Sequence, residues 1–184
     1  MPPSATTRLE TTLARLVLLD ANVILEAFRL GIWDLLVTKA QVSIASTVVG
    51  EVDHYFDPVT GQKTRIDLQS YITTRKVAVE QGDAVRMAAV RGACERYMEL
   101  HIGEVESIAV VADAGVKFCT ADHAAAKAMA LLDLSEQATS FEGVLRKHGI
   151  TPKLKMKPHF STATMNTWLK EGSILRVQTF GKKP

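Results

Sequence analysis

Two short apolar runs, each leading into an aspartate, constrain the fold of this chain most strongly. The run at 16–19 ends directly before Asp20, and the run at 116–119 ends shortly before Asp122. Short apolar runs bounded by polar residues are typical of buried strands, and the residues after each run have the apolar spacing of a helix. Strands that alternate with helices predict a parallel sheet with helices on both of its faces.

The same alternation continues along most of the chain. Further strands are expected at 42–45, 76–79 and 132–134. Helices are expected from residue 22 onward, at 32–38, and from a cap at Ser46 or Thr47 to Tyr55. A long helix is expected at 83–100, and Gly103 is expected to separate it from the next helix at 104–112. Two more helices are expected at 124–132 and 140–147. A loop is expected at 57–63. The pattern predicts one α/β domain over residues 1–150 and an extension over 151–184, with a short helix at 161–170 and a strand or arm at 174–180.

Charge is distributed unevenly between these two parts. The whole chain has 184 residues and a formal net charge of +2, but residues 151–184 hold seven Lys and Arg against Glu171 alone, a net charge of +6 that leaves −4 for the remainder. A basic extension on an acidic body is typical of polyanion-binding proteins, and equally of a solvated terminus. We hypothesise that Lys153, Lys155 and Lys157 contact a phosphate backbone.

Several classes of protein are excluded by what the sequence lacks. Cys94 and Cys119 have neither disulfide nor zinc spacing, and the five histidines show no metal-ligand spacing. The first 15 residues carry no apolar core of a signal sequence, and no stretch is long enough to span a bilayer. No Gly-rich phosphate loop, G-x-S-x-G or C-x-x-C motif is present. We expect a cytoplasmic protein with no membrane partner.

Acidic residues follow or adjoin several of the apolar segments. Taken singly, Asp20 and Asp122 are explained as helix N-caps, and Glu51, Glu104 and Glu106 as ordinary helix residues. If they gather at one edge of the sheet, however, their charges repel each other unless a cation neutralises them. Oxygen ligands without Cys or paired His favour Mg²⁺ or Mn²⁺, ions that support phosphoryl transfer.

Four segments together resemble one family. They are Leu-Leu-Asp-Ala-Asn-Val-Ile-Leu at 18–25, the helix residue Glu51, Gly-Glu-Val-Glu-Ser-Ile-Ala at 103–109 and Phe-Cys-Thr-Ala-Asp at 118–122. In this order the segments look like those of PIN domains (PilT N-terminus), the nuclease family that includes the VapC-like toxins. The resemblance covers residues 16 to 148.

The resemblance implies a fold, an activity and a set of site residues. The fold is a three-layer α/β/α sandwich with a central parallel sheet, and the activity is Mg²⁺- or Mn²⁺-dependent cleavage of RNA. The family's acidic quartet matches Asp20, Glu51, Glu106 and Asp122, and Asn22 and Thr120 match its supporting polar residues. Glu104 competes with Glu106 for the third position, where many members have an aspartate. We choose Glu106 because small and apolar residues follow it, as they follow the family's acid.

The resemblance also implies partners, and it leaves rival functions open. The partners are an RNA substrate, an antitoxin protein if the chain is a toxin, and a second copy of the chain in a homodimer. One rival is a catalytically silent PIN-like module that binds RNA or protein. A lower-ranked rival is a haloacid-dehalogenase-like phosphatase with Asp20 as nucleophile, although Asn22 cannot serve as the general acid of that mechanism.

Overall fold

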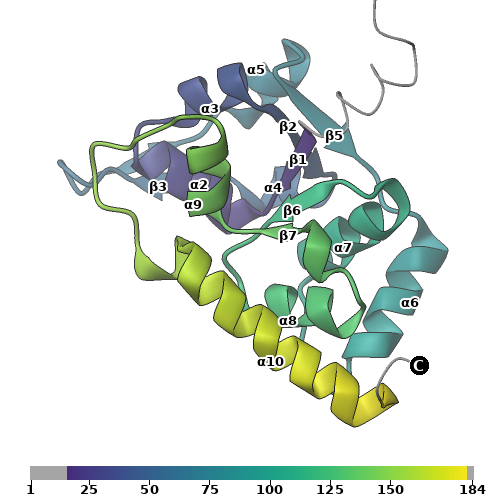
Figure 1. The fold of residues 1–184 in the computed structure, drawn as a ribbon. Helices are drawn as coiled ribbons and strands as arrows, with labels where there is room; N and C mark the ends of the chain where they lie inside the picture. Colours follow the sequence, from purple (N-terminus) through teal and green to yellow (C-terminus); the bar gives the residue numbers. More distant parts are fainter. Residues whose placement is uncertain (1–15, 182–184) are drawn as a thin grey trace, which may run out of the picture.

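The protein is described by a computed structural model that covers residues 16–181 (Figure 1). The segment 1–15, in which no signal sequence is expected, and Lys182 and Lys183 of the basic extension lie outside the described residues. Within these bounds, five strands form one parallel sheet in the order β5-β2-β1-β6-β7. The strands are β1 (Leu16–Leu19), β2 (Gln41–Ala45), β5 (Val77–Glu80), β6 (Lys117–Cys119) and β7 (Ala138–Thr139).

The direction in which strands are added reverses beside β1. The chain proceeds from β1 outward to β2 and β5, then returns to the other side of β1 to form β6 and β7. Leu19 and Cys119 are partners in the β1/β6 register, and the Asp20 N–H donates to the Cys119 carbonyl at 3.0 Å. In open parallel sheets ligands bind beyond the carboxyl ends of the strands at such a reversal. The ends of β1 and β6 are therefore where a site is expected.

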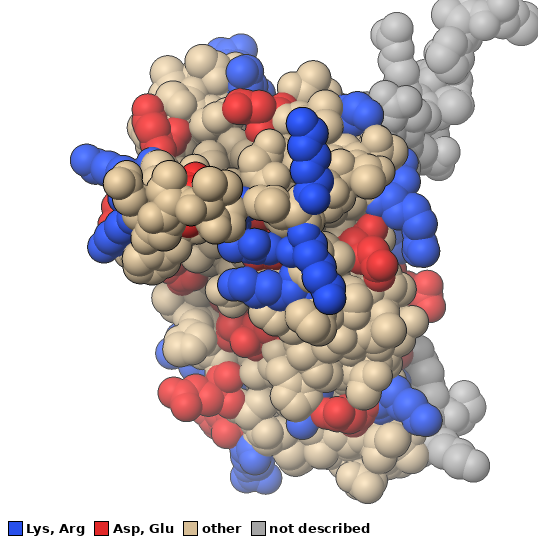
Figure 2. Space-filling model, turned by 90° about the vertical axis from the view of Figure 1, so that its left-hand side faces the viewer, with Lys and Arg blue, Asp and Glu red and all other residues tan. Residues whose placement is uncertain are grey.

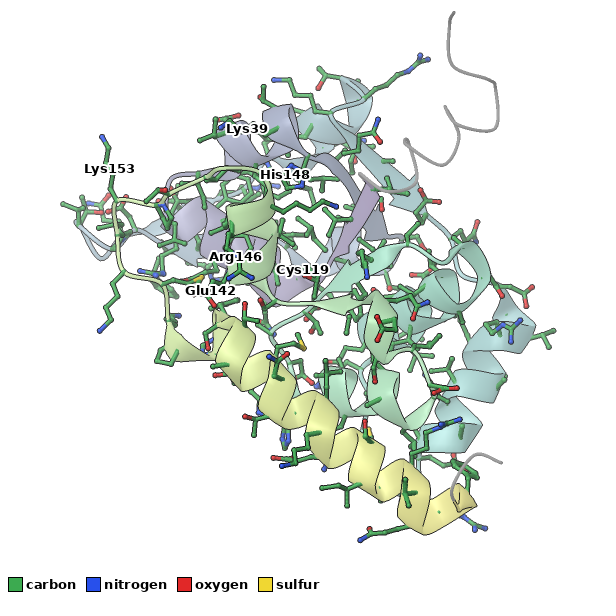
Figure 3. All side chains as sticks on the ribbon, in the orientation of Figure 1. Lys39, Cys119, Glu142, Arg146, His148 and Lys153 are labelled. Carbon is green, nitrogen blue, oxygen red and sulfur yellow. The ribbon has the colours of Figure 1, made fainter. Side chains whose placement is uncertain are left out.

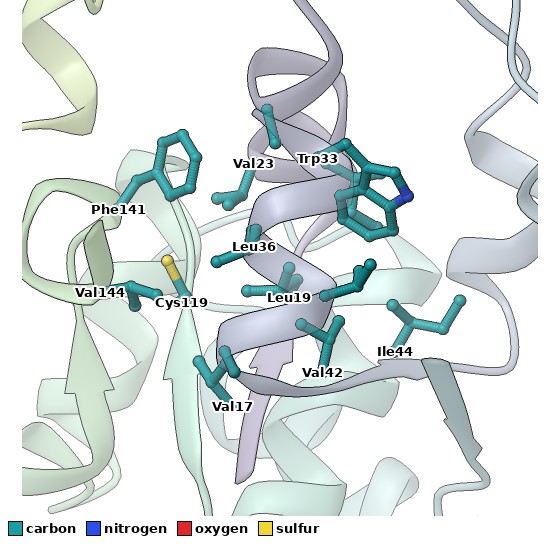
Figure 4. Packing of buried hydrophobic residues seen from close by; sticks show 14 of the residues in the cluster. Val17, Leu19, Val23, Trp33, Leu36, Val42, Ile44, Cys119, Phe141 and Val144 are labelled. Atoms are coloured by element: carbon teal, nitrogen blue, oxygen red, sulfur yellow. The ribbon is translucent and has the colours of Figure 1, made fainter. Parts of the chain in front are cut away.

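Successive side chains of β1 and β6 enter two different cores. Val17, Leu19 and Cys119 belong to one cluster of buried residues (Figure 4), and Leu18 and Phe118 belong to the other. The first core is covered by α2 (Ala21–Arg29), α3 (Trp33–Lys39) and α9 (Phe141–Lys147), and the second by α6 (Ala84–Cys94), α7 (Ile102–Ala114) and α8 (His123–Leu131). Helices thus cover both faces of the sheet (Figure 1), which confirms the predicted α/β/α sandwich.

A hairpin and an extra helix replace part of the expected second helix and loop. α4 (Val48–Glu51) is only one turn long, and β3 (His54–Phe56) pairs antiparallel with β4 (Lys63–Arg65) before α5 (Leu68–Thr73). The prediction of a helix to Tyr55 was wrong, whereas residues 57–62 form the predicted loop and only Lys63 belongs to a strand. Both strands of the hairpin are three residues long and largely exposed, so neither has the apolar pattern that predicts a buried strand.

The C-terminal segment is a long helix that lies against α8. After the short 3-10 helix η2 (Pro158–Phe160), α10 (Thr162–Phe180) runs without interruption, so the expected strand or arm at 174–180 was wrong. A Cβ atom at Gly172 would lie 2.4 Å from the Lys127 carbonyl oxygen, so the glycine allows α10 and α8 to approach closely. Leu169 and Leu175 pack against the second core. Packing on α8 therefore stabilises the helical course of residues 174–180. The alternating sequence pattern of these residues did not indicate it.

Three other boundaries differ from the prediction. α6 ends at Cys94 and not at residue 100, and Gly103 lies inside α7, where it is buried, and does not break a helix. The strand expected at 132–134 was wrong because Asp133 has a φ of 66° after the end of α8, and the chain forms η1 (Ser135–Gln137) before β7. Among residues 16–181, no helix has the length and apolar character needed to cross a membrane.

Candidate functional site

Asp20 and Asp122 are held at the carboxyl ends of neighbouring strands by one hydroxyl group. Asp20 follows β1 and is 4% exposed, and Thr120 follows β6 and is fully buried. The Thr120 hydroxyl donates to Asp20 Oδ2 at 2.8 Å and accepts a bond from the Asp122 backbone N–H at 3.0 Å. Asp122 Oδ1 in turn accepts a bond from the Ala125 N–H and caps α8. Thr120 was expected to be a polar neighbour of the acids, and its hydroxyl contacts Asp20 and the backbone of Asp122.

Asp20 occupies the N-cap position of α2 without serving as its cap. Its side chain makes no capping hydrogen bond, which differs from the ordinary explanation of an aspartate at this position. Burial raises the pKa of Asp20 to about 6 against the hydrogen bonds from Thr120 and Ala21, and the charges of Asp122 and Glu51 raise the pKa further. Burial and the nearby negative charges therefore both disfavour the ionised form of the Asp20 carboxyl group.

Glu51 reaches the same region from α4 by lying against the first turn of α7. A Cβ atom at Gly103 would lie 2.6 Å from Glu51 Oε1, so a larger residue would force this carboxylate to move from its position. Glu51 itself is exposed. The sequence suggested that Gly103 interrupts a helix. In the structure it lies inside α7 and makes space for an acid from a different segment of the chain.

Glu104 is the member of α7 that interacts with these acids. It is 7% exposed, and its Oε2 accepts a hydrogen bond from the His101 N–H at 2.8 Å. Burial raises the pKa of Glu104 to about 8, and the negative charges of Asp122, Asp20 and Glu51 act in the same direction. Glu104 therefore lies near enough to Asp20, Glu51 and Asp122 for their charges to act on it.

Glu106 faces a different set of partners, although it is only two residues further along α7. Its carboxylate accepts hydrogen bonds from the Ser46 hydroxyl at 2.7 Å, the Thr47 N–H and hydroxyl at 2.8 and 2.6 Å, and the Gly82 N–H at 3.0 Å. Burial disfavours its ionisation, but these hydrogen bonds outweigh burial and lower the pKa of Glu106. Glu106 therefore joins the loops that follow β2 and β5.

The donor chemistry of the four coupled acids fits a hard divalent cation, but their spacing in this structure does not enclose one. No Lys, Arg or His side chain within residues 16–181 forms an ion pair with Asp20, Glu51, Glu104 or Asp122. In the same range, no three His, Cys, Asp or Glu side chains converge closely enough to hold a metal ion. Binding an ion would require the four carboxylates to draw together.

Comparisons with known proteins add nothing to this geometry. No family model, curated protein or solved structure matches the chain. The resemblance to PIN domains consequently stays a prediction, and the arguments below depend on the residues of this chain alone.

The expected basic residues lie on an exposed segment, and Lys157 lines a pocket together with Glu51 of the candidate site. Lys153, Lys155 and Lys157 are all exposed, and Lys153 extends outward from the loop that follows α9 (Figure 3). The Lys155 carbonyl accepts a hydrogen bond from Arg29 of α2 at 2.9 Å, which fixes the segment to the domain. On the corresponding face of the molecule, Lys and Arg side chains gather across the middle with acidic side chains around them (Figure 2).

A pocket that the sequence did not indicate lies between α2, the β3–β4 hairpin and this basic segment. Its volume is about 380 Å³, and its lining includes Asn22 and Glu51 of the candidate site together with Phe56 and Lys157. Asn22 was expected to be a polar neighbour of the acids, and it is exposed at the edge of this pocket. Gly61, which has a φ of 68° in the hairpin turn, was the available signal for the hairpin that carries Phe56.

Proposed function

We propose that this protein is a Mg²⁺- or Mn²⁺-dependent endoribonuclease. The observation that carries the proposal is that the Thr120 hydroxyl joins Asp20 and Asp122 where the strand order reverses, and that the negative charges of Glu51 and Asp122 act on the buried carboxylates of Asp20 and Glu104. Burial, and then the charges of neighbouring acids, raise the pKa values of Asp20 and Glu104, and no cationic side chain among the described residues is paired with either, which favours a bound cation. Such an ion would activate a water molecule and stabilise the charge of a phosphodiester under attack.

The proposal assigns the third acidic position to Glu104 in place of Glu106. Glu104 shares its electrostatic environment with the other three acids, whereas both carboxylate oxygens of Glu106 are occupied by donors from two loops. Thr120 holds Asp20 and Asp122 in their relative orientation. Asn22 is placed to contact substrate at the edge of the adjoining pocket.

The experiment that tests the activity compares cleavage of a panel of labelled RNAs in Mn²⁺ by the wild type, Asp20→Asn and Asp122→Asn. We expect each variant to lose more than about 100-fold in rate, since even the residues that orient metal ligands contribute about 10- to 100-fold. Equal rates of RNA cleavage by all three proteins would contradict the catalytic proposal. RNA binding without cleavage would favour the silent module, and a phosphoryl group trapped on Asp20 would favour the phosphatase.

The basic segment supports RNA as the substrate. Lys153, Lys155 and Lys157 are exposed on a segment that Arg29 and Glu26 tie to α2, and Lys157 lines the pocket that Glu51 also lines. Replacing all three lysines with alanine should weaken RNA binding and lower the slope of log affinity against log salt concentration by up to about 2 to 3 units, because fewer counterions are released from the RNA. Fluorescence anisotropy over a salt series measures the slope, and an unchanged slope contradicts the assignment.

The cellular setting of the activity is part of the proposal. Cys94 and Cys119 are both free and buried, which supports a reducing compartment such as the cytoplasm. An antitoxin partner and a homodimer stay predictions of the family resemblance. Size-exclusion chromatography coupled to light scattering tests the second of these directly.

A further inference from the structure

The pocket beside the acids combines features that bind a nucleotide. Its volume of about 380 Å³ lies within the usual range for small-ligand sites. Glu51 and Asn22 line it, so a molecule that fills the pocket also reaches the acidic site. Lys157 lines it too, and within residues 16–181 no acidic side chain is paired with Lys157.

Aromatic rings form another part of the lining. Phe56 is 61% exposed on β3, and the His54 ring stands edge-on to it with the ring centroids 5.7 Å apart. On the facing segment, the His159 ring lies against Phe160 at 4.3 Å. An exposed aromatic ring beside a cationic side chain is the combination that binds the bases and phosphates of single-stranded nucleic acids.

The walls of the pocket are fixed by buried contacts. Glu26, which is 3% exposed, pairs with Arg29 at 2.6 Å and accepts a hydrogen bond from the Lys157 N–H at 3.3 Å. On the opposite side, the Tyr55 ring stacks on Phe28 of α2 with the centroids 5.9 Å apart. The hairpin and the basic segment are therefore both anchored to α2, and the pocket between them is preformed.

We infer that this pocket holds one unpaired nucleotide of the RNA strand next to the bond that is cut, with its base stacked on Phe56 and its phosphate against Lys157. The inference rests on the proposed function and adds to it a nucleotide-binding pocket with Phe56 and Lys157 as its contacts. A base within a duplex cannot present its face to Phe56, because its neighbours in the helix already cover it. The protein should therefore select RNA that is single-stranded at the cleavage position.

Binding of a fluorescein-labelled RNA hexamer, single-stranded or annealed to its complement, tests the inference. The measurements are made in Mn²⁺ with the full chain carrying Asp20→Asn, in which cleavage is blocked but RNA can bind. Phe56→Ala and Phe56→Leu should weaken binding of the single strand by about tenfold or more, whereas Phe56→Trp should keep it within about twofold. Affinity for the duplex should change by less than about twofold in every variant.

Val59→Ala is the matched control, because Val59 is 85% exposed on the same hairpin and does not line the pocket. It should leave binding of the single strand unchanged, and the melting temperature of each variant verifies that the hairpin is intact. If the parent binds the single strand and Phe56→Ala binds it equally well, the inference fails and the nuclease proposal stands. If the wild type neither binds nor cuts RNA, both fail.

Discussion

Glu104 and Glu106 lie two residues apart on the same helix and are both buried, yet their surroundings are opposite. Glu104 is near three other acids, and its pKa rises to about 8 because of burial and their charges. Glu106 accepts hydrogen bonds from Ser46, Thr47 and Gly82, which lower its pKa in spite of burial. Burial alone therefore does not mark a functional carboxylate. What differs is the balance of donors and charges: Glu106 accepts four hydrogen bonds, whereas Glu104 accepts one from the His101 N–H and lies near three other acids.

The largest expected effect separates the two glutamates by activity. Glu104→Gln should reduce the Mn²⁺-dependent rate of RNA cleavage by more than about 100-fold, because the variant loses a charge from the set that favours the ion. Glu106→Gln should retain the rate of the wild type wherever it remains folded. Initial rates below the melting temperature of both variants make the comparison, and the reverse result would return the third position to Glu106.

The second effect is a dependence of stability on pH in the absence of divalent ions. The folded-state pKa of Glu104, about 8, is above the ordinary value of 4.5, so its contribution is complete below pH 4.5 and is lost as pH rises through 8. Asp20 adds a smaller loss between 3.8 and about 6. The free energy of unfolding should fall by about 2 to 3 kcal/mol between pH 5.5 and pH 8.

Urea titrations at the two pH values in EDTA measure this change in free energy. Glu104→Gln should remove most of the slope, since the amide carries no charge at either pH. Mn²⁺ should restore stability at pH 8 in the wild type and restore less of it in Glu104→Gln. If the free energy of unfolding depends on pH equally in both proteins, Glu104 is not the source of the dependence.

The third effect is the cost of breaking the Glu106 contacts. Glu106→Gln should lower the free energy of unfolding by about 2 kcal/mol, because an amide cannot accept bonds from all of the donors in Thr47, Ser46 and Gly82. Glu99→Gln, at an exposed position, is the control and should change stability by less than about 0.5 kcal/mol. Equal losses in the two variants would contradict the structural role of Glu106.

The smallest effect on stability is expected for a change at Gly103, which should nevertheless lower the rate of RNA cleavage. Gly103→Ala should change the free energy of unfolding by less than about 1 kcal/mol, since the helix preference of alanine offsets the crowding. Its Cβ would nevertheless displace the Glu51 carboxylate, which lies 2.6 Å from that position, and reduce the rate of RNA cleavage by about tenfold. Thermal melting and initial rates measure the two effects separately.

Gly92→Ala is the matched control for this change. Gly92 lies in α6, and a Cβ there would meet no atom within 4 Å. The variant should gain up to about 1 kcal/mol in stability with an unchanged rate. If Gly103→Ala keeps the full rate as well, the Glu51 carboxylate does not take part in the site.

Sequence reasoning succeeded where the signal was local and repeated. β1 and β6 are short apolar runs, so the positions of Asp20 and Asp122 beyond their ends followed from the general geometry of parallel sheets. The hairpin of β3 and β4 was missed because both strands are three residues long and largely exposed, so neither shows the apolar pattern of a buried strand. The helical course of residues 174–180 was missed because it depends on packing against α8.

The choice between two acids on one helix shows what only the tertiary structure decided. The sequence by itself determined an α/β sandwich and several acids at its carboxyl edge, because hydrophobic periodicity and chain direction set these features. Residues two positions apart on a helix point to different sides, since each residue turns the helix by about 100°. Which side meets Asp20 and Asp122, and which side meets the donors of Ser46 and Thr47, depends on how distant loops pack around α7.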